Sequence, residues 1–227
     1  MIRLTWLGHA SWLIEDGTHK ILLDPFLTEN PAATATVDDF TDATHVLLSH
    51  GHFDHVADAA AVLEASGAQL VTNYEIAEWF GKHHGVTNAI GMNIGGNVSI
   101  GEGSAKMTPA LHSSSLPDGS YAGAAAGFVI SLGGCRVYFA CDTAYFSDMK
   151  WYAHGVDVAV LPIGDLFTMG VDDSLEAIKL IEPKIVLPMH YGTWPPIEQD
   201  ASAWVQKVES ETGSKAKAPA VGEPFEL

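Results

Sequence analysis

Residues 50 to 55 read HGHFDH, which places three histidines and one aspartate within six positions. This run directly follows an apolar, strand-like stretch at residues 44–49. Neutral imidazole and carboxylate are ligands for zinc and neighbouring first-row ions, and a strand-to-loop junction can turn several such side chains toward one point. Such a dense cluster rarely arises by chance. It predicts a metal site, and one that holds two ions.

Composition and length predict a globular protein with a large interior. The chain has 227 residues, of which 47% are hydrophobic, and we expect one domain spanning residues 1–227. No apolar run approaches the roughly 20 residues of a membrane span, and the first residues read as a strand rather than a signal peptide. Cys135 and Cys141 lie on one expected strand, badly placed to bridge each other. These features predict a cytoplasmic protein with reduced thiols.

The charge of the chain restricts its partners. A formal charge of −17 repels phosphate polymers and gains nothing from counterion release, so no nucleic-acid partner is expected. A small anionic substrate is still allowed, because bound cations would reverse the local field. We expect a small-molecule substrate and no membrane partner. The aromatic segments 79–80 and 194–196 would favour a homo-oligomer if they are exposed, and could equally belong to the core.

Runs of strands interleaved with helices predict a mixed α/β sandwich with sheets inside and helices outside. Strands are expected at residues 2–8, 11–15, 20–23, 44–49, 68–72, 126–132, 135–140, 156–161 and 184–189, with short strands between 86 and 111 and an edge strand at 221–227. Helices are expected at 55–66, 74–82, 144–152, 172–181 and 198–209. The long loops 25–42 and 113–123 are expected to shape the mouth of a pocket.

Three further candidate ligands each follow an expected strand, namely His112, Asp142 and His190. Strand ends that open into loops are where sites on α/β scaffolds are assembled. Together with the run at residues 50–55 they supply five histidines and two aspartates. This number of donors is enough for two ions that each keep an open or water-filled position.

The order of these motifs resembles the metallo-β-lactamase superfamily. HGHFDH is followed by an isolated histidine, by Cys-Asp-Thr after a strand, and by Pro-Met-His-Tyr at residues 188–191. The opening Trp-Leu-Gly-His-Ala at residues 6–10 and Pro-Ile-Gly-Asp at 162–165 look closest to the small UPF0173-type, lactonase-like branch of metal-dependent hydrolases. The resemblance covers nearly the whole chain. It implies an α/β fold, the four-layer αββα sandwich of two similar halves.

The resemblance also implies how two divalent ions per chain are held, with zinc as the first choice and manganese, iron or nickel also accepted by such ligands. It implies seven ligands, divided between a first ion (His50, His52 and His112), a second ion (Asp54, His55 and His190) and one bridging carboxylate (Asp142). Two cations roughly 3.5–4 Å apart can share one hydroxide, lower its pKa and stabilise charge on the attacking and leaving oxygens. The expected reaction is therefore hydrolysis of a small ester, lactone or phosphodiester.

Four residues receive individual roles, each with a simpler alternative. Asp54 and Asp142 are expected to act in catalysis, Asp54 by holding the hydroxide in line, although either could instead cap a helix. His9 would contact substrate or protonate the leaving group near neutral pH, or else be a hydrogen-bonded structural histidine. Asp24 would accept the second N–H of a metal-bound histidine, or form a simple Asp-Pro turn.

Other functions of the same superfamily fit less well. A ribonuclease-like phosphodiesterase is opposed by the acidic surface. Di-iron redox proteins of this fold carry Glu where His52 stands and need a flavin domain, and a non-catalytic sensor would have lost ligands, whereas none is missing. Zinc β-lactamases use Cys near the position that Asp142 occupies, which argues against antibiotic hydrolysis.

Overall fold

A computed structural model describes residues 2–227, and its centre is a pair of seven-stranded mixed sheets. The first sheet contains, in spatial order, β14 (Pro224–Glu226), β1 (Arg3–Gly8), β2 (Ser11–Glu15), β3 (Lys20–Leu23), β4 (His45–Leu47), β5 (Gln69–Asn73) and β6 (Ala89–Met92). The second contains β13 (Lys215–Ala216), β12 (Ile185–Met189), β11 (Val158–Pro162), β10 (Cys135–Phe139), β9 (Ala126–Leu132), β8 (Gly103–Pro109) and β7 (Asn97–Ile100).

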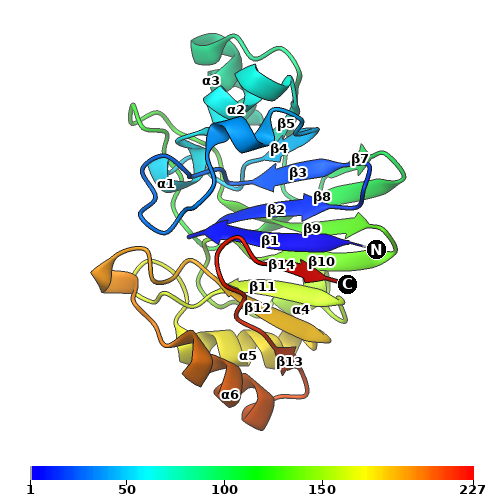
Figure 1. Ribbon diagram of the computed structural model, residues 1–227, viewed down its shortest axis with the longest axis vertical. Coiled ribbons are helices and arrows are strands. Elements are labelled where there is room, and N and C mark those ends of the chain that lie inside the picture. The colour runs from blue at the N-terminus through cyan, green and yellow to red at the C-terminus, as the bar shows by residue number, and fades with distance from the viewer. Residues whose placement is uncertain (1) are drawn as a thin grey trace.

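Helices cover the outer faces of both sheets. They are α1 (Phe53–Val56), α2 (Ala59–Ser66), α3 (Tyr74–His84), α4 (Met149–Ala153), α5 (Val171–Ile181) and α6 (Ala201–Glu211), with short 3-10 turns η1 (Val37–Phe40) and η2 (Pro195–Ile197). In Figure 1, α2 and α3 lie at the top, α5 and α6 at the bottom, and the two sheets between them. Within residues 2–227, none of the helices combines the length and the apolarity needed to cross a bilayer.

The two sheets share one apolar core. Trp12 of the first sheet packs against Phe139 of the second with ring centroids 6.0 Å apart, and both side chains are fully buried. Separate apolar clusters lie under the helices, with Phe80 of α3 on the first sheet and Trp204 of α6 on the second. Burial of large apolar side chains contributes roughly 1.5–3 kcal/mol each. The predicted sandwich with sheets inside and helices outside is confirmed.

The carboxyl ends of several strands meet at one edge of the molecule. In the first sheet β3, β4, β5 and β6 pair in parallel, and in the second β10, β11, β12 and β13 do. Strand β11 reads VAVLP and is buried throughout, as is typical of a parallel strand covered on both faces. The loops after β1, β4, β8, β10 and β12 carry the candidate ligands at this edge. Figure 1 shows α1 at this edge, opposite the paired termini.

The helix expected at 198–209 is α6 at Ala201–Glu211, and two other predicted helices differ more from their expected bounds. The helix expected at 55–66 is divided into α1 and α2, and Asp58 lies between them. The Asp58 carboxylate does not cap α2, because it accepts the backbone N–H of Leu27 at 2.6 Å. The helix expected at 144–152 begins only at Met149. Ala144, the expected first residue of this helix, instead donates its N–H to the carbonyl of Leu111 at 3.1 Å. Long-range hydrogen bonds therefore override the local helical pattern at both places.

Candidate metal centre

The seven candidate ligands and His9 converge at the shared carboxyl edge of the two sheets. His50 follows β4, His112 follows β8, Asp142 follows β10 and His190 follows β12. His9 occupies the turn between β1 and β2. Side chains that are far apart in the sequence are thus brought to one place by strands that end at the same edge.

Three histidines form the first group. His50 Nε2 lies 2.9 Å from His52 Nδ1. One ring nitrogen from each of His50, His52 and His112 lies within 4.8 Å of the others. His50 is fully buried, whereas the other two side chains reach the surface of a pocket. This is the histidine set that the family resemblance implies for the first ion.

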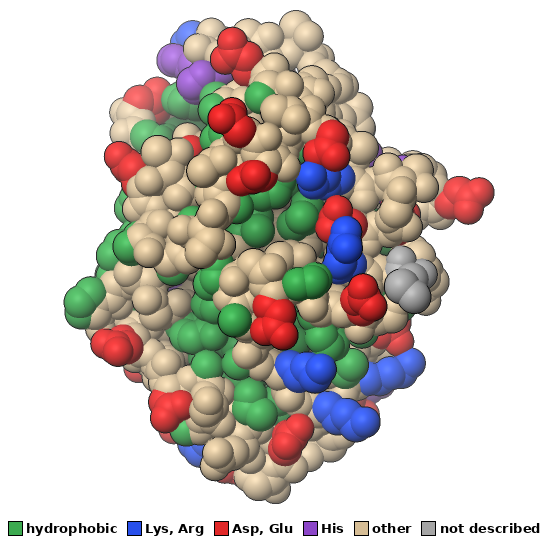
Figure 2. Space-filling view, viewed as in Figure 1, with side chains coloured by type: hydrophobic (Ala, Val, Ile, Leu, Met, Phe, Trp, Pro, Cys, Tyr) green, Lys and Arg blue, Asp and Glu red, His purple; other side chains and the backbone are tan. Residues whose placement is uncertain are grey.

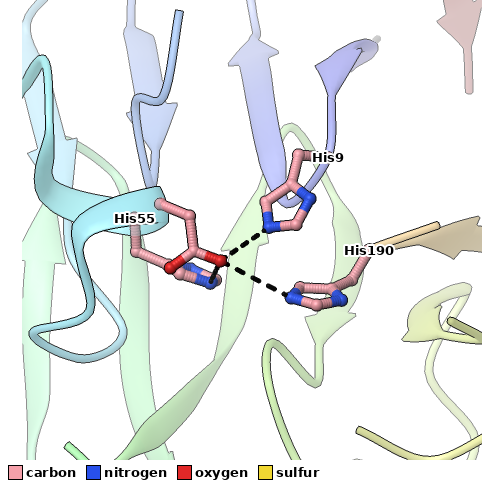
Figure 3. A group of neighbouring side chains, drawn as sticks. His9, His55 and His190 are labelled. Atoms are coloured by element: carbon pink, nitrogen blue, oxygen red, sulfur yellow. Dashed lines mark hydrogen bonds and ion pairs between the residues drawn. The ribbon is translucent and has the colours of Figure 1, made fainter. Parts of the chain in front are cut away.

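The second group surrounds the carboxylate of Asp54. Its Oδ2 lies 3.9 Å from His55 Nε2 and 3.9 Å from His190 Nε2. His9 Nε2 lies closer, at 3.0 Å. Figure 3 shows the rings of His9, His55 and His190 approaching this one carboxylate from three directions. The group thus contains the set assigned to the second ion, with His9 as an additional member.

Asp142 lies between the two groups. Its Oδ2 is 3.6 Å from His112 Nε2 of the first group, and 3.4 Å and 3.0 Å from the Nε2 atoms of His55 and His190 in the second. Two ligands of one tetrahedral zinc, each bound at about 2.0–2.1 Å, lie roughly 3.3 Å apart. The observed separations match that spacing on both sides of Asp142.

The donor atoms fit divalent cations. His55 Nε2 and Asp142 Oδ1 are buried and lack a hydrogen-bond partner, although the other Asp142 oxygen is 3.4 Å from the His55 nitrogen. Buried polar atoms are normally paired, so unpaired atoms in a cluster point to a missing partner. Imidazole and carboxylate together suit zinc, manganese, iron or nickel. The residues present therefore fit the metal site that the sequence predicts.

Protonation in the cluster reflects burial and mutual charge. Burial lowers the pKa of His50 well below its ordinary value. Burial alone would raise the pKa of Asp142, but His190 and His55 hold it well below its usual range. Burial would likewise lower the pKa of His55, whereas the carboxylates of Asp142 and Asp24 raise it well above the ordinary value. A neutral His50 and an ionised Asp142 are the forms that bind cations. Because the pKa of His55 is raised, His55 must lose a proton before it can bind a cation.

Backbone strain is concentrated at the same edge. Non-glycine residues with positive φ include His9 (54°), Asp24 (46°), Cys141 (53°) and His190 (53°). Such conformations are costly for residues with a Cβ and often occur at functional sites. His190 keeps its conformation partly because its N–H donates to the His9 carbonyl at 2.9 Å. The strain turns side chains at strand ends toward the site.

Asp24 lies directly behind His55. Its Oδ2 is 2.8 Å from His55 Nδ1 and accepts the Ser49 hydroxyl at 2.5 Å. Its Oδ1 accepts the Ser49 N–H at 2.7 Å. The structure therefore places Asp24 where a partner for a metal-binding histidine would lie. Ser49 was not identified from the sequence, because a serine ending an apolar strand carries no signal of its own.

His9 is fully buried and both ring nitrogens are occupied. Nε2 faces Asp54, and Nδ1 lies 2.8 Å from the Thr193 hydroxyl. Burial lowers the pKa of His9 to about 4, against the opposing effect of the Asp54 hydrogen bond, so the ring is neutral near pH 7. Since the carboxylate only accepts, Nε2 carries the proton and Nδ1 accepts from Thr193. Thr193 was missed in the sequence because only the fold brings it to His9.

A pocket of about 810 Å³ opens above the cluster. Its lining combines ligand candidates with apolar side chains, the latter being Phe53, Leu116, Pro117, Phe167, Trp194 and Pro196. Trp194, which the sequence left open as a surface patch or core residue, is partly buried and lines this pocket. A hollow of about 1000 Å³ at the opposite edge is lined by hairpin-turn residues such as Asp16 and Gly133, and includes none of the candidate ligands.

Comparison with known proteins agrees with this geometry. A family model described as Beta-lactamase superfamily domain matches residues 19–191. A UPF0173 metal-dependent hydrolase from Thermus thermophilus is 44% identical over 228 residues, covering 100% of both chains. The chain belongs to the UPF0173 metal-dependent hydrolase family. The resemblance inferred from the sequence motifs is thereby confirmed, and the buried His and Asp cluster is the feature that a metal-dependent hydrolase requires.

Two solved structures superpose over the whole chain. Igni18, a metallo hydrolase from Ignicoccus hospitalis, has a TM-score of 0.88 and 34% identity, covering 100% of this chain and 99% of that one. The metallo-β-lactamase fold protein YhfI from Bacillus subtilis has a TM-score of 0.79 at 15% identity, covering 100% of both chains. The second likeness concerns the fold alone. The predicted metallo-β-lactamase fold is confirmed.

Proposed function

We propose that this protein is a dinuclear metallohydrolase that cleaves a small ester, lactone or phosphodiester. The observation that carries the proposal is the position of Asp142, whose Oδ2 lies within 3.6 Å of donors from both groups. A carboxylate shared in this way is suited to two neighbouring cations rather than one. A structural single-ion site would be closed by its own ligands and would not open into a pocket.

The proposed ligands follow from the two groups. They are His50, His52 and His112 for the first ion, Asp54, His55 and His190 for the second, and Asp142 for both. Zinc is the first choice, and manganese, iron and nickel accept the same donors. When bound, such a pair lowers the pKa of a shared water and stabilises negative charge on the attacking and leaving oxygens.

We assign Asp54 the role of orienting the attacking water. It lines the pocket. Burial would raise its pKa, but His55 and His9 together lower it below the ordinary range, so the carboxylate is ionised at neutral pH. An ionised carboxylate accepts a hydrogen bond from water and can hold that water in line with a substrate bound in the pocket.

We assign His9 a positioning role. The ring is buried, does not line the pocket, and has both nitrogens engaged, by Asp54 and by Thr193. A proton donor to a leaving group must reach the substrate, and this ring does not face the pocket. Its N–H instead fixes the direction of the Asp54 carboxylate. The geometry favours this role over the proton transfer considered from the sequence.

Metal analysis combined with turnover tests the proposal. Protein reconstituted with zinc or manganese is expected to bind two ions per chain and to hydrolyse at least one of p-nitrophenyl butyrate, dihydrocoumarin and bis-p-nitrophenyl phosphate. Asp142→Ala should lower both the ion content and the rate, whereas Asp173→Ala, which removes an exposed carboxylate on α5 outside the pocket, should change neither. Full turnover by Asp142→Ala, or one ion per chain at saturation, would refute the dinuclear mechanism.

A further inference from the structure

We infer that the pocket above the metal centre selects uncharged acyl substrates that carry an apolar alkyl or aryl group, and that it disfavours phosphodiester anions. This inference rests on the proposed hydrolase function and specifies the substrate class of the same site. The supporting observations are the division of the pocket into a polar floor and apolar walls, the packing of Phe53 and Trp194 on the buried Phe26, and the absence of lysine and arginine from the walls.

The walls present large apolar side chains to solvent. Phe53 is 51% exposed and Phe167 is 54% exposed, and both line the pocket together with Trp194. Leu116 and Pro196 continue the same surface. Exposed aromatic side chains gathered around a concave site, rather than scattered singly, are typical of a surface that is covered when a ligand binds.

The aromatic wall is held in a fixed arrangement. The rings of Phe53 and Trp194 have centroids 6.1 Å apart, and each packs on the buried Phe26, at 5.8 Å and 6.0 Å respectively. These distances lie in the range of favourable aromatic pairs. A wall that is already ordered loses little conformational entropy on binding, so it can bind an apolar group without first rearranging.

Phe167 reaches the pocket from a strained loop. The two residues before it, Asp165 and Leu166, have positive φ values of 61° and 55°. A loop does not adopt two successive left-handed residues without compensation elsewhere. The Asp165 carboxylate accepts the Leu166 N–H at 2.8 Å and so supports the turn. This strained turn leads directly into Phe167, whose side chain lines the pocket together with Phe53 and Trp194.

The walls offer an anion no positive charge. None of the eleven lysines and arginines of the chain, all of them within the described residues, lines the pocket. In the view of Figure 2 the basic side chains lie mainly toward the end where the termini meet, away from α1. Besides the candidate ligands, the polar side chains of the lining are the hydroxyls of Ser113 and Ser115. Sites that bind phosphate esters commonly provide arginine, lysine or several N–H donors.

The energetic consequence separates the two substrate classes. The cations proposed for the floor would interact with the reacting carbonyl or phosphoryl group of either class. The groups on both sides of the reacting atom must then enter the apolar part of the pocket. A phosphodiester carries its negative charge on the non-bridging oxygens beside the proposed cations, and the walls add no further ionic partner to offset its large loss of hydration. A neutral ester loses less hydration and gains by burying its alkyl or aryl group.

Hydrolysis rates across a homologous series test the inference. Protein with a measured content of two ions per chain would be assayed with p-nitrophenyl acetate, butyrate and hexanoate and with bis-p-nitrophenyl phosphate. We expect kcat/KM to rise roughly threefold per added methylene and to be lowest for the phosphodiester. Phe167→Ala should lower kcat/KM for the hexanoate on the order of tenfold with little effect on the acetate. Trp151→Ala, which removes an aromatic side chain that is 76% exposed outside the pocket, should leave the series unchanged.

Binding to the metal-free protein provides a readout that does not depend on turnover. N-phenylbutanamide, a neutral acyl compound, is expected to bind by calorimetry, more weakly to Phe167→Ala, and phenyl phosphate is expected not to bind. A flat chain-length series, or a phosphodiester faster than every ester, would overturn the inference while leaving the hydrolase function intact. Absence of any hydrolysis by the two-ion protein would refute the proposed function, and the calorimetric comparison would then decide the pocket preference alone.

Discussion

Replacing Asp24 by asparagine tests how the buried carboxylate fixes the orientation of a candidate ligand. Asp24 Oδ2 lies 2.8 Å from His55 Nδ1, and Oδ1 accepts the Ser49 N–H at 2.7 Å. Because a carboxylate only accepts, His55 Nδ1 carries a proton and directs Nε2 toward Asp142. Asp24→Asn preserves shape and volume. Whichever way the amide is turned, its NH2 group meets an N–H donor, at His55 or at Ser49.

The size of the effect follows from the hydrogen bonds that the substitution removes. If the His55 proton moves to Nε2 to accommodate the amide, the nitrogen that faces the site loses its lone pair. Loss of such an outer partner weakens metal binding about 10- to 100-fold, which corresponds to about 1.4–2.7 kcal/mol. Loss of one hydrogen bond to a charged group lowers the free energy of unfolding by about 1.5–3 kcal/mol. In a chain of this size the melting temperature should fall by roughly 3–12 °C.

The assay separates metal affinity from stability. Zinc affinity would be measured by competition with a chromophoric chelator, and stability by thermal melting of the metal-free protein. Asp58→Asn is the matched control, because Asp58 is also buried and accepts hydrogen bonds from the Leu27 N–H at 2.6 Å and the Thr28 hydroxyl at 2.5 Å. It should lower stability with unchanged zinc affinity. If Asp24→Asn melted at a lower temperature but bound two zinc ions as tightly as the wild type, this account of His55 would be refuted.

Three further changes have defined outcomes. Thr193→Val removes the hydroxyl that donates to His9 and should lower kcat on the order of tenfold without changing metal content, with recovery in Thr193→Ser; an unchanged kcat would leave the hydroxyl without a role. Gly164→Ala places a Cβ in steric conflict with the His190 carbonyl oxygen and should lower the free energy of unfolding by about 1–3 kcal/mol, measured by urea titration. Burial would raise the pKa of Asp16, but N–H groups of its own turn lower it to about 2. The ionised Asp16 carboxylate therefore stabilises the folded protein fully above the unfolded pKa of about 3.9, and this stabilisation is lost as the pH falls toward 2. An NMR titration in which the Asp16 carboxyl has an ordinary pKa would contradict this prediction.

Much of the fold could be predicted because its signals are local. The apolar run of β11 and the glycine that ends α2 at Gly67 are visible within a few residues of sequence. The candidate ligands could also be predicted, since few side chains bind first-row ions and HGHFDH contains four of them. Where local signals competed with distant hydrogen bonds, as at Asp58, the predicted helix was too long.

The sequence by itself determined which residues are candidate ligands, and the order of its motifs determined the fold family. The tertiary structure decided which of these side chains share a partner. His9 and Thr193 are separated by 184 positions and still lie 2.8 Å apart, and Asp142 reaches both histidine groups because β8, β10 and β12 end at one edge. The tertiary structure also brought together the apolar side chains that line the pocket with Phe167. Hydrogen bonds and aromatic packing depend on distance and angle, and these are set by the packing of the two sheets rather than by spacing along the chain.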